Sequence, residues 1–331
     1  MFHRIFAFSL VAIAALLPLS PLTGQAPAAP AAGGAVKLQW KFEKDKPFYQ
    51  EMTTDTTQTM MIQGNKVENI QKQTFYFSWT PKEQDKDGNW KLLQKIEGVK
   101  MDFTISGSKV SYDSTKESTG NNPLGDFFKV LVGSEFTVTL DKNLKATKIE
   151  GSGEFLKKLI GQNQQMETLL KQILNEETLK EMAGPTFASL PDKEVKPGDS
   201  WESPPIKLDM GPIGRYDVGY KYTDEGKGKD KATENFDKIR VDTTLKYTEP
   251  GENVGGLPFK IKKAELQPTK SSGVIYFDNA KGRMETSESE MELKGKLSIE
   301  IAGMITTVDL TQTQKTIIKN MDKNPVEPAK K

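Results

Sequence analysis

Hydrophobic and polar residues alternate over long stretches of this chain, and that pattern predicts β-strands. The first such stretch carries Val36, Leu38, Trp40 and Phe42, which are separated by polar residues. A period of two places all four side chains on one face of a strand. We therefore expect a half-buried strand over residues 36–42.

Turn residues separate the alternating stretches and divide them into hairpins. Residues 52–62 and 71–79 flank Gly64-Asn65, which predicts one long hairpin. Asp87-Gly88 leads into a strand over residues 90–96, and we expect Gly98 to form a bulge that resets the register before residues 99–105. Further hairpins are expected around residues 106–108 and between residues 136–140 and 146–149.

One segment, about residues 153–183, follows a helical period instead. Apolar residues recur there at the spacing of one helix face, namely Met166, Leu169, Leu170, Ile173 and Leu174. Asn175 is a candidate cap for a following helix, and Gly184-Pro185 is expected to end that helix. A proline-rich crossover, with Pro191, Pro197, Pro204, Pro205 and Pro212, then leads back to strands. The clearest of these strands are residues 291–301 and 304–310.

These elements predict a mainly β fold. We expect long antiparallel strands in one or two curved sheets, or in an incomplete barrel, with the helical insertion packed over it. The chain then divides into an N-terminal β half (residues 35–151), the helical insertion (152–190), a C-terminal β half (191–320) and a disordered tail (321–331).

The first 26 residues have the layout of a secretory signal peptide. His3 and Arg4 precede an apolar run from Ile5 to Leu17, and small residues follow at Gly24 and Ala26. The alternative is a membrane anchor, but the run is shorter than the roughly 20 residues that a spanning helix needs. Residues 27–34 form an Ala/Pro/Gly linker that we expect to be disordered. The sequence therefore predicts an exported protein, periplasmic or extracellular, with no transmembrane segment once the signal is removed.

Composition narrows the chemistry that the exported chain can perform. The 331 residues include no cysteine and one histidine, His3, which lies in the predicted signal peptide. Without imidazole or thiol, Ser-His-Asp triads, cysteine nucleophiles and zinc, haem or iron–sulfur sites built on these groups are excluded. Removal of Arg4 leaves 45 basic side chains (46 − 1) against 45 acidic ones, so no net charge attracts nucleic acid. We expect no catalytic residue, no cofactor and no metal, and hence a protein that is not an enzyme.

Three motifs could carry chemistry, and each has a simpler structural interpretation. Ser106-Gly107-Ser108-Lys109 fits the S-x-x-K pattern of serine–lysine nucleophiles, but that chemistry requires a helix and strands flank the motif here. Asp85-Lys86-Asp87-Gly88 begins like a calcium loop, but Ile96 stands where the final glutamate is required. Glu288, Glu290 and Glu292 share one face of a predicted strand with lysines close by, so we expect a solvated face.

Six segments of the chain together resemble a known family. They are Thr74-Phe-Tyr-Phe-Ser-Trp-Thr80, Gln84-Asp-Lys-Asp-Gly-Asn-Trp90, Lys95-Ile-Glu-Gly-Val-Lys-Met101, Ser111-Tyr-Asp-Ser114, Val132-Gly-Ser-Glu-Phe136 and Gly198-Asp-Ser-Trp201. The family consists of exported bacterial proteins, common in planctomycetes, that are catalogued as a domain of unknown function. The resemblance covers nearly all of the mature chain and implies secretion and a β-rich fold, with no site residue to transfer. The expected architecture is also similar to that of periplasmic lipoprotein carriers, a likeness at the level of fold only.

Three functions are compatible with these features. The first is a non-enzymatic exported protein that binds an apolar or lipid-like ligand between curved sheet and lid helices, with candidate ligand-binding residues Met166, Leu169, Leu170 and Ile173. The second is a structural or protein-interaction module of the cell envelope, whose interior is filled by its own side chains. The third is a carboxylate-only glycoside hydrolase, which needs two carboxyl groups across a cleft. The expected partner is thus an apolar small molecule or an envelope protein.

Overall fold

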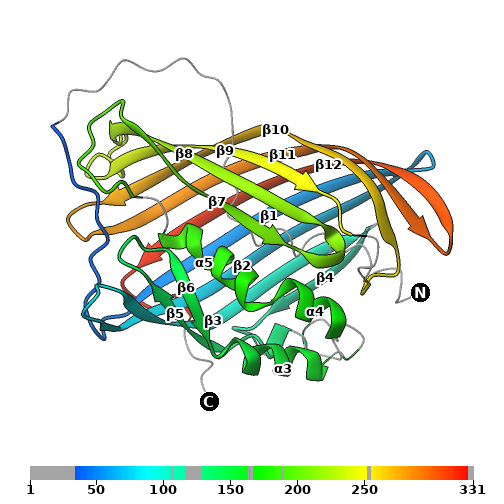
Figure 1. Ribbon diagram of the computed structural model, residues 1–331, viewed down its shortest axis with the longest axis horizontal. Helices are drawn as coiled ribbons and strands as arrows, with labels where there is room; N and C mark the ends of the chain where they lie inside the picture. The colour runs from blue at the N-terminus through cyan, green and yellow to red at the C-terminus, as the bar shows by residue number, and fades with distance from the viewer. Residues whose placement is uncertain are drawn as a thin grey trace.

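A single antiparallel sheet dominates the structure (Figure 1). The computed structural model describes residues 34–105, 107–116, 125, 128–162, 164, 167–187, 190–251 and 255–326. Within these residues twelve strands pair in the order β6-β5-β3-β2-β1-β12-β11-β10-β9-β8-β7, and β4 pairs with β3. The expected mainly β fold is confirmed, and both β halves belong to one sheet.

The strands are long and the helices lie between the sixth and the seventh. The strand bounds are β1 Phe48–Ile62, β2 Asn65–Gln84, β3 Trp90–Ile105, β4 Ser108–Asp113, β5 Glu135–Leu140, β6 Ala146–Glu150, β7 Ser200–Asp209, β8 Arg215–Lys227, β9 Asp237–Thr248, β10 Lys260–Asp278, β11 Arg283–Ile301 and β12 Met304–Met321. The helices of the insertion are α3 Ser152–Gln162, α4 Glu167–Ile173 and α5 Glu176–Phe187, and a short 3-10 helix, η3, covers Gly211–Ile213.

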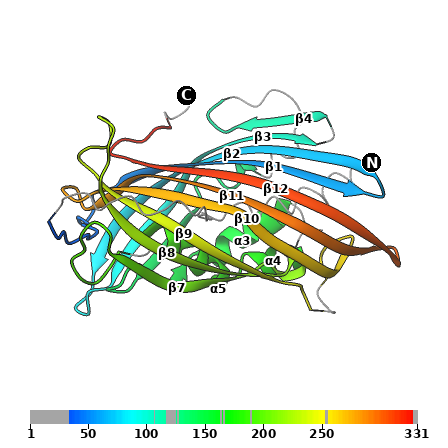
Figure 2. The same ribbon diagram turned by 90° about the horizontal axis from the view of Figure 1, so that it is seen from above.

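The helical insertion spans the gap between the two edges of the sheet. The edge strands are β6 and β7, and the insertion is the chain that connects them. Helix α5 contacts both of these strands. Figures 1 and 2 show the sheet curled, with the helices on its concave side. The sheet itself is not closed, and the helices complete the wall.

The first and last strands along the chain, β1 and β12, pair with each other in the middle of the sheet and join the two halves. β1 and β12 run antiparallel from the pair Tyr49–Met321 to the pair Ile62–Val308. Alternation within each strand fixes which face is buried, because a slip of one residue would turn every side chain over. The alternation does not determine which distant strand pairs with β1.

The turns follow the sequence closely. Gln63 and Gly64 both have positive φ, +50° and +81°, as a two-residue hairpin turn requires, so the turn lies one residue earlier than expected. The expected bulge at Gly98 is confirmed, since Tyr76 pairs with Gly98 and Phe77 with Ile96. A Cβ atom on Gly98 would lie 3.0 Å from the Val326 Cγ2 atom, a tight contact that favours glycine at this position.

Residues 36–42 do not form the strand that we expected. Their one ladder contact is an isolated bridge between Val36 and Val195, and the Lys41 N–H donates to the Gly282 carbonyl. The alternation still governs burial, because Leu38 and Trp40 are 1% and 7% exposed. The segment is therefore an extended chain that packs side chains into the core without joining the hydrogen-bond ladder of the sheet.

Two further expectations about prolines are wrong. Helix α5 continues through Gly184-Pro185 as far as Phe187, which is fully buried. Burial of that aromatic ring offsets the hydrogen bond that the proline removes. Pro204 and Pro205 lie inside β7, at a register shift between Ser203 and Ile206. An edge strand tolerates proline because one side of its backbone has no partner strand.

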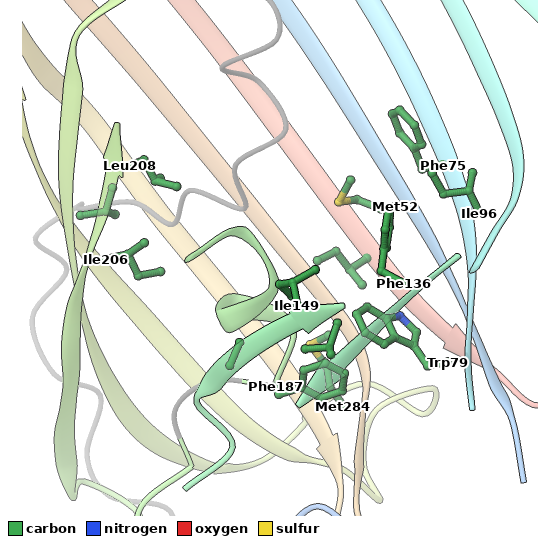
Figure 3. Packing of buried hydrophobic residues seen from close by; sticks show 14 of the residues in the cluster. Met52, Phe75, Trp79, Ile96, Phe136, Ile149, Phe187, Ile206, Leu208 and Met284 are labelled. Atoms are coloured by element: carbon green, nitrogen blue, oxygen red, sulfur yellow. The ribbon is translucent and has the colours of Figure 1, made fainter. Parts of the chain in front are cut away.

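The buried apolar side chains form two separate clusters. The main cluster joins the helices, the 36–42 segment and the helical end of the sheet, and Figure 3 shows Trp79, Phe136 and Phe187 within it. The second cluster consists of Met60, Ile299, Val308 and Leu310 at the other end of β1, β11 and β12. Polar residues separate the two, and they define the candidate site.

Candidate ligand-binding face of the sheet

The concave face of β1 is buried from Phe48 to Met60, although four of these seven residues are polar. Every second residue from Phe48 to Met60 is buried, while the residues between them are partly exposed. The charges lie on the outer face, where the Lys72 Nζ atom is 3.5 Å from a carboxylate oxygen of Asp55. The inner face of β1 thus carries only uncharged side chains.

Polar residues on three neighbouring strands meet in the middle of this inner face. On β1 they are Thr54, Thr56 and Gln58, which pair with Gln73, Gln71 and Asn69 of β2. The same three pair on the other side with Thr316, Gln314 and Gln312 of β12. We call these nine residues the polar belt. Apart from Asn69, which is partly exposed, every member is at most 6% exposed.

Several side chains of the polar belt hydrogen-bond to one another. The Gln58 Nε2 atom donates to Gln312 Oε1 at 3.0 Å, and the Asn69 Nδ2 atom donates to Gln58 Oε1 at 3.4 Å. The Gln71 Nε2 atom donates to Gln73 Oε1 at 2.9 Å. Such a network holds the amide groups in fixed orientations, because each amide that donates also fixes its own carbonyl oxygen.

Three oxygens of the polar belt have no hydrogen-bond partner among the described residues. They are Thr56 Oγ1, Asn69 Oδ1 and Gln71 Oε1, and each is inaccessible to solvent. Leaving a buried polar atom unpaired costs about 1–3 kcal/mol. Thr56 and Gln71 occupy paired positions on adjacent strands, so two of these atoms belong to neighbouring side chains. Buried polar atoms without a partner are rare in folded proteins, so a pair of them on adjacent strands indicates a functional role.

Apolar residues border the polar belt on both sides. Toward the helices the next pair is Met52–Ile318, which belongs to the main cluster. Away from the helices the next pair is Met60–Leu310, which belongs to the second cluster. The inner face is therefore amphipathic along the strand direction, with an uncharged polar zone between two apolar zones.

The second cluster has no contribution from the helices. Its four buried members lie on β1, β11 and β12. Its partly buried neighbours lie on the same sheet or directly before β10, and they are Ile62, Val67, Phe259, Ile261, Leu266 and Leu297. A sheet face is normally buried against a second layer. Among the described residues, no helix supplies that layer here.

The candidate residues of the helical insertion that the structure describes belong to the main cluster and not to the second cluster. Leu169, Leu170 and Ile173 are on α4 and are at most 1% exposed within the main cluster, and Met166 lies outside the described residues. Their contact with a ligand stays a prediction. Sequence reasoning missed the polar belt, although one signal was available: Thr54, Thr56 and Gln58 share the parity of Met52 and Met60, while every charge of β1 has the other parity.

Two buried carboxylates lie near the end of the β8–β9 hairpin. Asp224 is 2% and Asp237 is 3% exposed. The Asp224 Oδ1 atom accepts the Gly226 N–H at 2.7 Å, and Asp237 Oδ1 is 2.8 Å from the Lys227 Nζ atom. Burial raises the pKa of Asp224, and the nearby Asp237 and Asp199 carboxylates raise it further. Burial also raises the pKa of Glu181 on α5.

The motifs singled out in the sequence have structural roles. Ser106 lies outside the described residues, and the rest of that motif joins β3 to β4. Asp85 accepts backbone N–H groups of Asp87 and Asn89, and hydrogen bonding from Asn89 lowers its pKa, as in a turn. No group of three or more potential metal ligands occurs among the described residues.

The glutamate row of β11 is a solvated face, as expected. Glu288, Glu290 and Glu292 each lie within 3 Å of a lysine Nζ atom, those of Lys315, Lys270 and Lys294 respectively. These pairs are partly exposed, so each contributes little to stability. They mark the outer surface of the sheet.

Comparison with known proteins gives a similarity to one family over part of the chain. Residues 87–243, just under half of the chain, match the model of a family of unknown function (DUF6263). The chain is similar to that family over this stretch, in agreement with the expected resemblance to a domain of unknown function. No curated protein matches.

Several solved structures match this chain with low TM-scores. Lipovitellin, in a structure concerned with its lipid–protein interactions, has a TM-score of 0.43 and 12% identity over 88% of this chain, which spans 26% of the lipovitellin chain. DynF of the dynemicin biosynthesis pathway of Micromonospora chersina has a TM-score of 0.21 and 8% identity, covering 92% of this chain and 93% of its own. OccK5 of Pseudomonas aeruginosa has a TM-score of 0.25 and 8% identity, covering 85% and 100%. At such low similarity we argue the function from the residues of this chain.

The search for membrane-spanning helices gave a negative result. Across the described ranges, no helix combines the length and the apolar character that crossing a bilayer requires.

Proposed function

We propose that this protein is an exported, non-enzymatic binding protein that holds an apolar or lipid-like ligand against the concave face of its sheet. The observation that carries this proposal is the second cluster. Its apolar side chains lie on one face of one sheet, beyond the reach of the helices in the described part of the chain. A lipid-like ligand would pack against this face of the sheet, with the helical insertion as the neighbouring wall.

The side chains of the main cluster limit where the ligand can lie. The Phe187 ring is 4.9 Å from that of Trp79 and 5.3 Å from that of Trp40, so aromatic side chains fill the helical end. We therefore place the ligand on the polar belt and the second cluster, with the Met52–Ile318 pair of the main cluster at its inner boundary. Export follows from the predicted signal peptide and is part of the proposal.

The experiment is to recover the ligand from the protein after export. Protein purified without detergent is extracted with organic solvent, the extract is analysed by mass spectrometry, and the delipidated protein is melted with and without added lipid. We expect a stoichiometric apolar species and a higher melting temperature on its return. An empty extract together with an unchanged melting temperature for every lipid added would refute the proposal.

A matched pair of variants locates the site. Leu310→Asn places a polar group in the second cluster, and Thr311→Asn changes the neighbouring residue on the other face of β12. We expect the first variant to lose the bound species and the second to keep it. Equal loading of both variants would move the ligand away from the second cluster.

An interaction module of the cell envelope is the second candidate, and one observation favours it. The β11–β12 hairpin ends in exposed apolar residues, of which Ile301, Met304 and Ile305 are 42%, 70% and 67% exposed. Exposed apolar residues at one tip mark an interaction surface. Cross-linking of the exported protein in cells, with Met304→Ser/Ile305→Ser as the comparison, tests this function: loss of a specific adduct in the variant supports it.

The hydrolase alternative now has a location where it can be tested. Asp224 and Asp237 are the two most deeply buried carboxylates among the described residues, and such an enzyme would need buried carboxylates, although a turn and an ion pair already engage these two. Turnover of a glycan that is abolished by Asp224→Asn and by Asp237→Asn would favour this alternative over a binding protein.

A further inference from the structure

We propose that the polar belt selects ligands that carry an uncharged hydrogen-bond donor, such as a hydroxyl group, at the head of an apolar chain. This inference rests on the proposed function and names the chemical class of its ligand. The observation behind it is independent of the second cluster, because it concerns unpartnered polar atoms and not apolar surface.

The unpartnered atoms of the polar belt are mainly acceptors. Gln71 Oε1 and Asn69 Oδ1 can only accept a hydrogen bond, whereas the Thr56 hydroxyl can donate as well as accept. Gln71 and Thr56 are 6% and 5% exposed, so bulk solvent does not reach them. A ligand that binds beside these two residues can therefore donate a hydrogen bond to Gln71 Oε1. Its own oxygen can accept a hydrogen bond from the Thr56 hydroxyl.

One hydroxyl group can serve two of these atoms at once. Thr56 and Gln71 are directly opposite each other on β1 and β2, where side chains start about 4.5–5.5 Å apart. A ligand hydroxyl between them can donate to Gln71 Oε1 and accept from the Thr56 hydroxyl. The Gln71 amide is already oriented, since its Nε2 atom donates to Gln73 Oε1 at 2.9 Å.

The charge pattern argues against an anionic head group. None of the nine residues of the polar belt is charged, and their unpartnered amide oxygens would face a carboxylate or phosphate with like partial charge. The charges of the adjoining strand positions lie on the outer face, as the Lys72–Asp55 pair does. Burying an anion without a compensating cation is costly.

The apolar part of the ligand has a defined direction. Beyond Gln58 the inner face continues through Met60–Leu310 to Ile62–Val308, all within or against the second cluster. In the other direction the aromatic rings of the main cluster fill the space. The hydroxyl therefore binds the polar belt and the chain extends toward the tip of the β11–β12 hairpin.

Three ligands of equal chain length test this inference. Delipidated protein binds a fluorescent apolar probe, which is displaced at pH 8 by 1-hexadecanol, by its methyl ether or by hexadecanoate. The alcohol and the ether differ in the donor, and the carboxylate adds a charge. We expect the alcohol to bind about 3- to 10-fold more tightly than the ether, the gain of one hydrogen bond, and hexadecanoate to bind more weakly than both.

Variants connect that preference to the polar belt. Thr56→Val keeps the shape and removes the hydroxyl, and Thr57→Val does the same on the outer face of the same strand. We expect Gln71→Leu, which removes the acceptor of the ligand's hydroxyl proton, to abolish the preference for alcohol over ether. Thr56→Val should weaken the binding of both ligands alike, without lowering the melting temperature of the delipidated protein, and Thr57→Val should leave both affinities unchanged.

The outcomes separate this inference from the proposed function. Tight binding of all three ligands with no preference, or a preference for alcohol that survives in Gln71→Leu, would overturn the inference and leave a general lipid-binding protein. Failure of all three ligands to displace the probe, with no lipid in the extract, would refute the proposed function itself.

Discussion

Replacement of Phe187 by alanine is the most direct test of how the helical insertion is held to the sheet. The Phe187 side chain is fully buried and meets Trp79 edge-on, with 4.9 Å between ring centroids and 89° between planes. Trp40 and Phe42 approach it at 5.3 and 5.9 Å. Removing a buried phenylalanine costs about 3–5 kcal/mol, and each edge-on aromatic pair adds about 0.5–1.5 kcal/mol beyond buried area. We expect a loss near the upper end, about 4–5 kcal/mol.

The assay is urea unfolding of the mature protein, followed by far-UV circular dichroism. The change in midpoint gives the loss in the free energy of unfolding, provided that the slope m is unchanged. Ile305→Ala is the control, since that side chain is 67% exposed and should change stability by less than about 0.5 kcal/mol. A loss below about 2 kcal/mol for Phe187→Ala would refute the view that this ring anchors the insertion.

Three further variants test separate parts of the structure. Asp224→Asn should raise the free energy of unfolding at pH 7. Burial raises the pKa of Asp224 in the folded state above 3.8, so the folded state loses stability as the pH rises through this raised pKa. Asparagine has no charge to bury and can still accept the Gly226 N–H. Unfolding midpoints between pH 3 and 8 check this, and a variant less stable than the parent at pH 7 would contradict it. Asn175→Ala should cost about 1 kcal/mol, because Asn175 Oδ1 caps α5 by accepting the Thr178 N–H at 2.9 Å; an unchanged urea midpoint would exclude that role. Gly295→Ala should lower the free energy of unfolding by about 1–3 kcal/mol, since a Cβ atom there would lie 1.8 Å from the Glu265 carbonyl oxygen. An unchanged melting temperature would show that β10 shifts without cost.

The local features of the fold could be predicted because they follow from short-range rules. Alternation identified the long strands, and Gly98 identified the bulge between β2 and β3. The same alternation misled us at Val36–Phe42, because a period of two reports burial and does not report whether a neighbouring strand is present. Likewise Gly184-Pro185 favours a helix end locally, but the burial of Phe187 is a tertiary effect.

The pairing of β1 with β12 could not be predicted, because the residues of each pair lie more than 240 positions apart in the chain. The polar belt depends on that pairing. Its threonines and glutamines form a common strand pattern within each segment, and they become a site only when three strands bring them together. What the sequence did contain was the parity of Thr56 with Met52 and Met60, which places it on the inner face.

Photo-cross-linking tests the central claim most directly, namely that the concave face of the sheet holds a neutral amphiphile. The probe is a 16-carbon alcohol with a diazirine next to its hydroxyl group, added to the delipidated protein, irradiated and mapped by peptide mass spectrometry. The account predicts adducts on the segments of the polar belt, residues 54–58, 69–73 and 312–316, that unlabelled 1-hexadecanol suppresses. Adducts on the outer face or on the hairpin tip at residues 301–305, or adducts that unlabelled alcohol does not suppress, would contradict it.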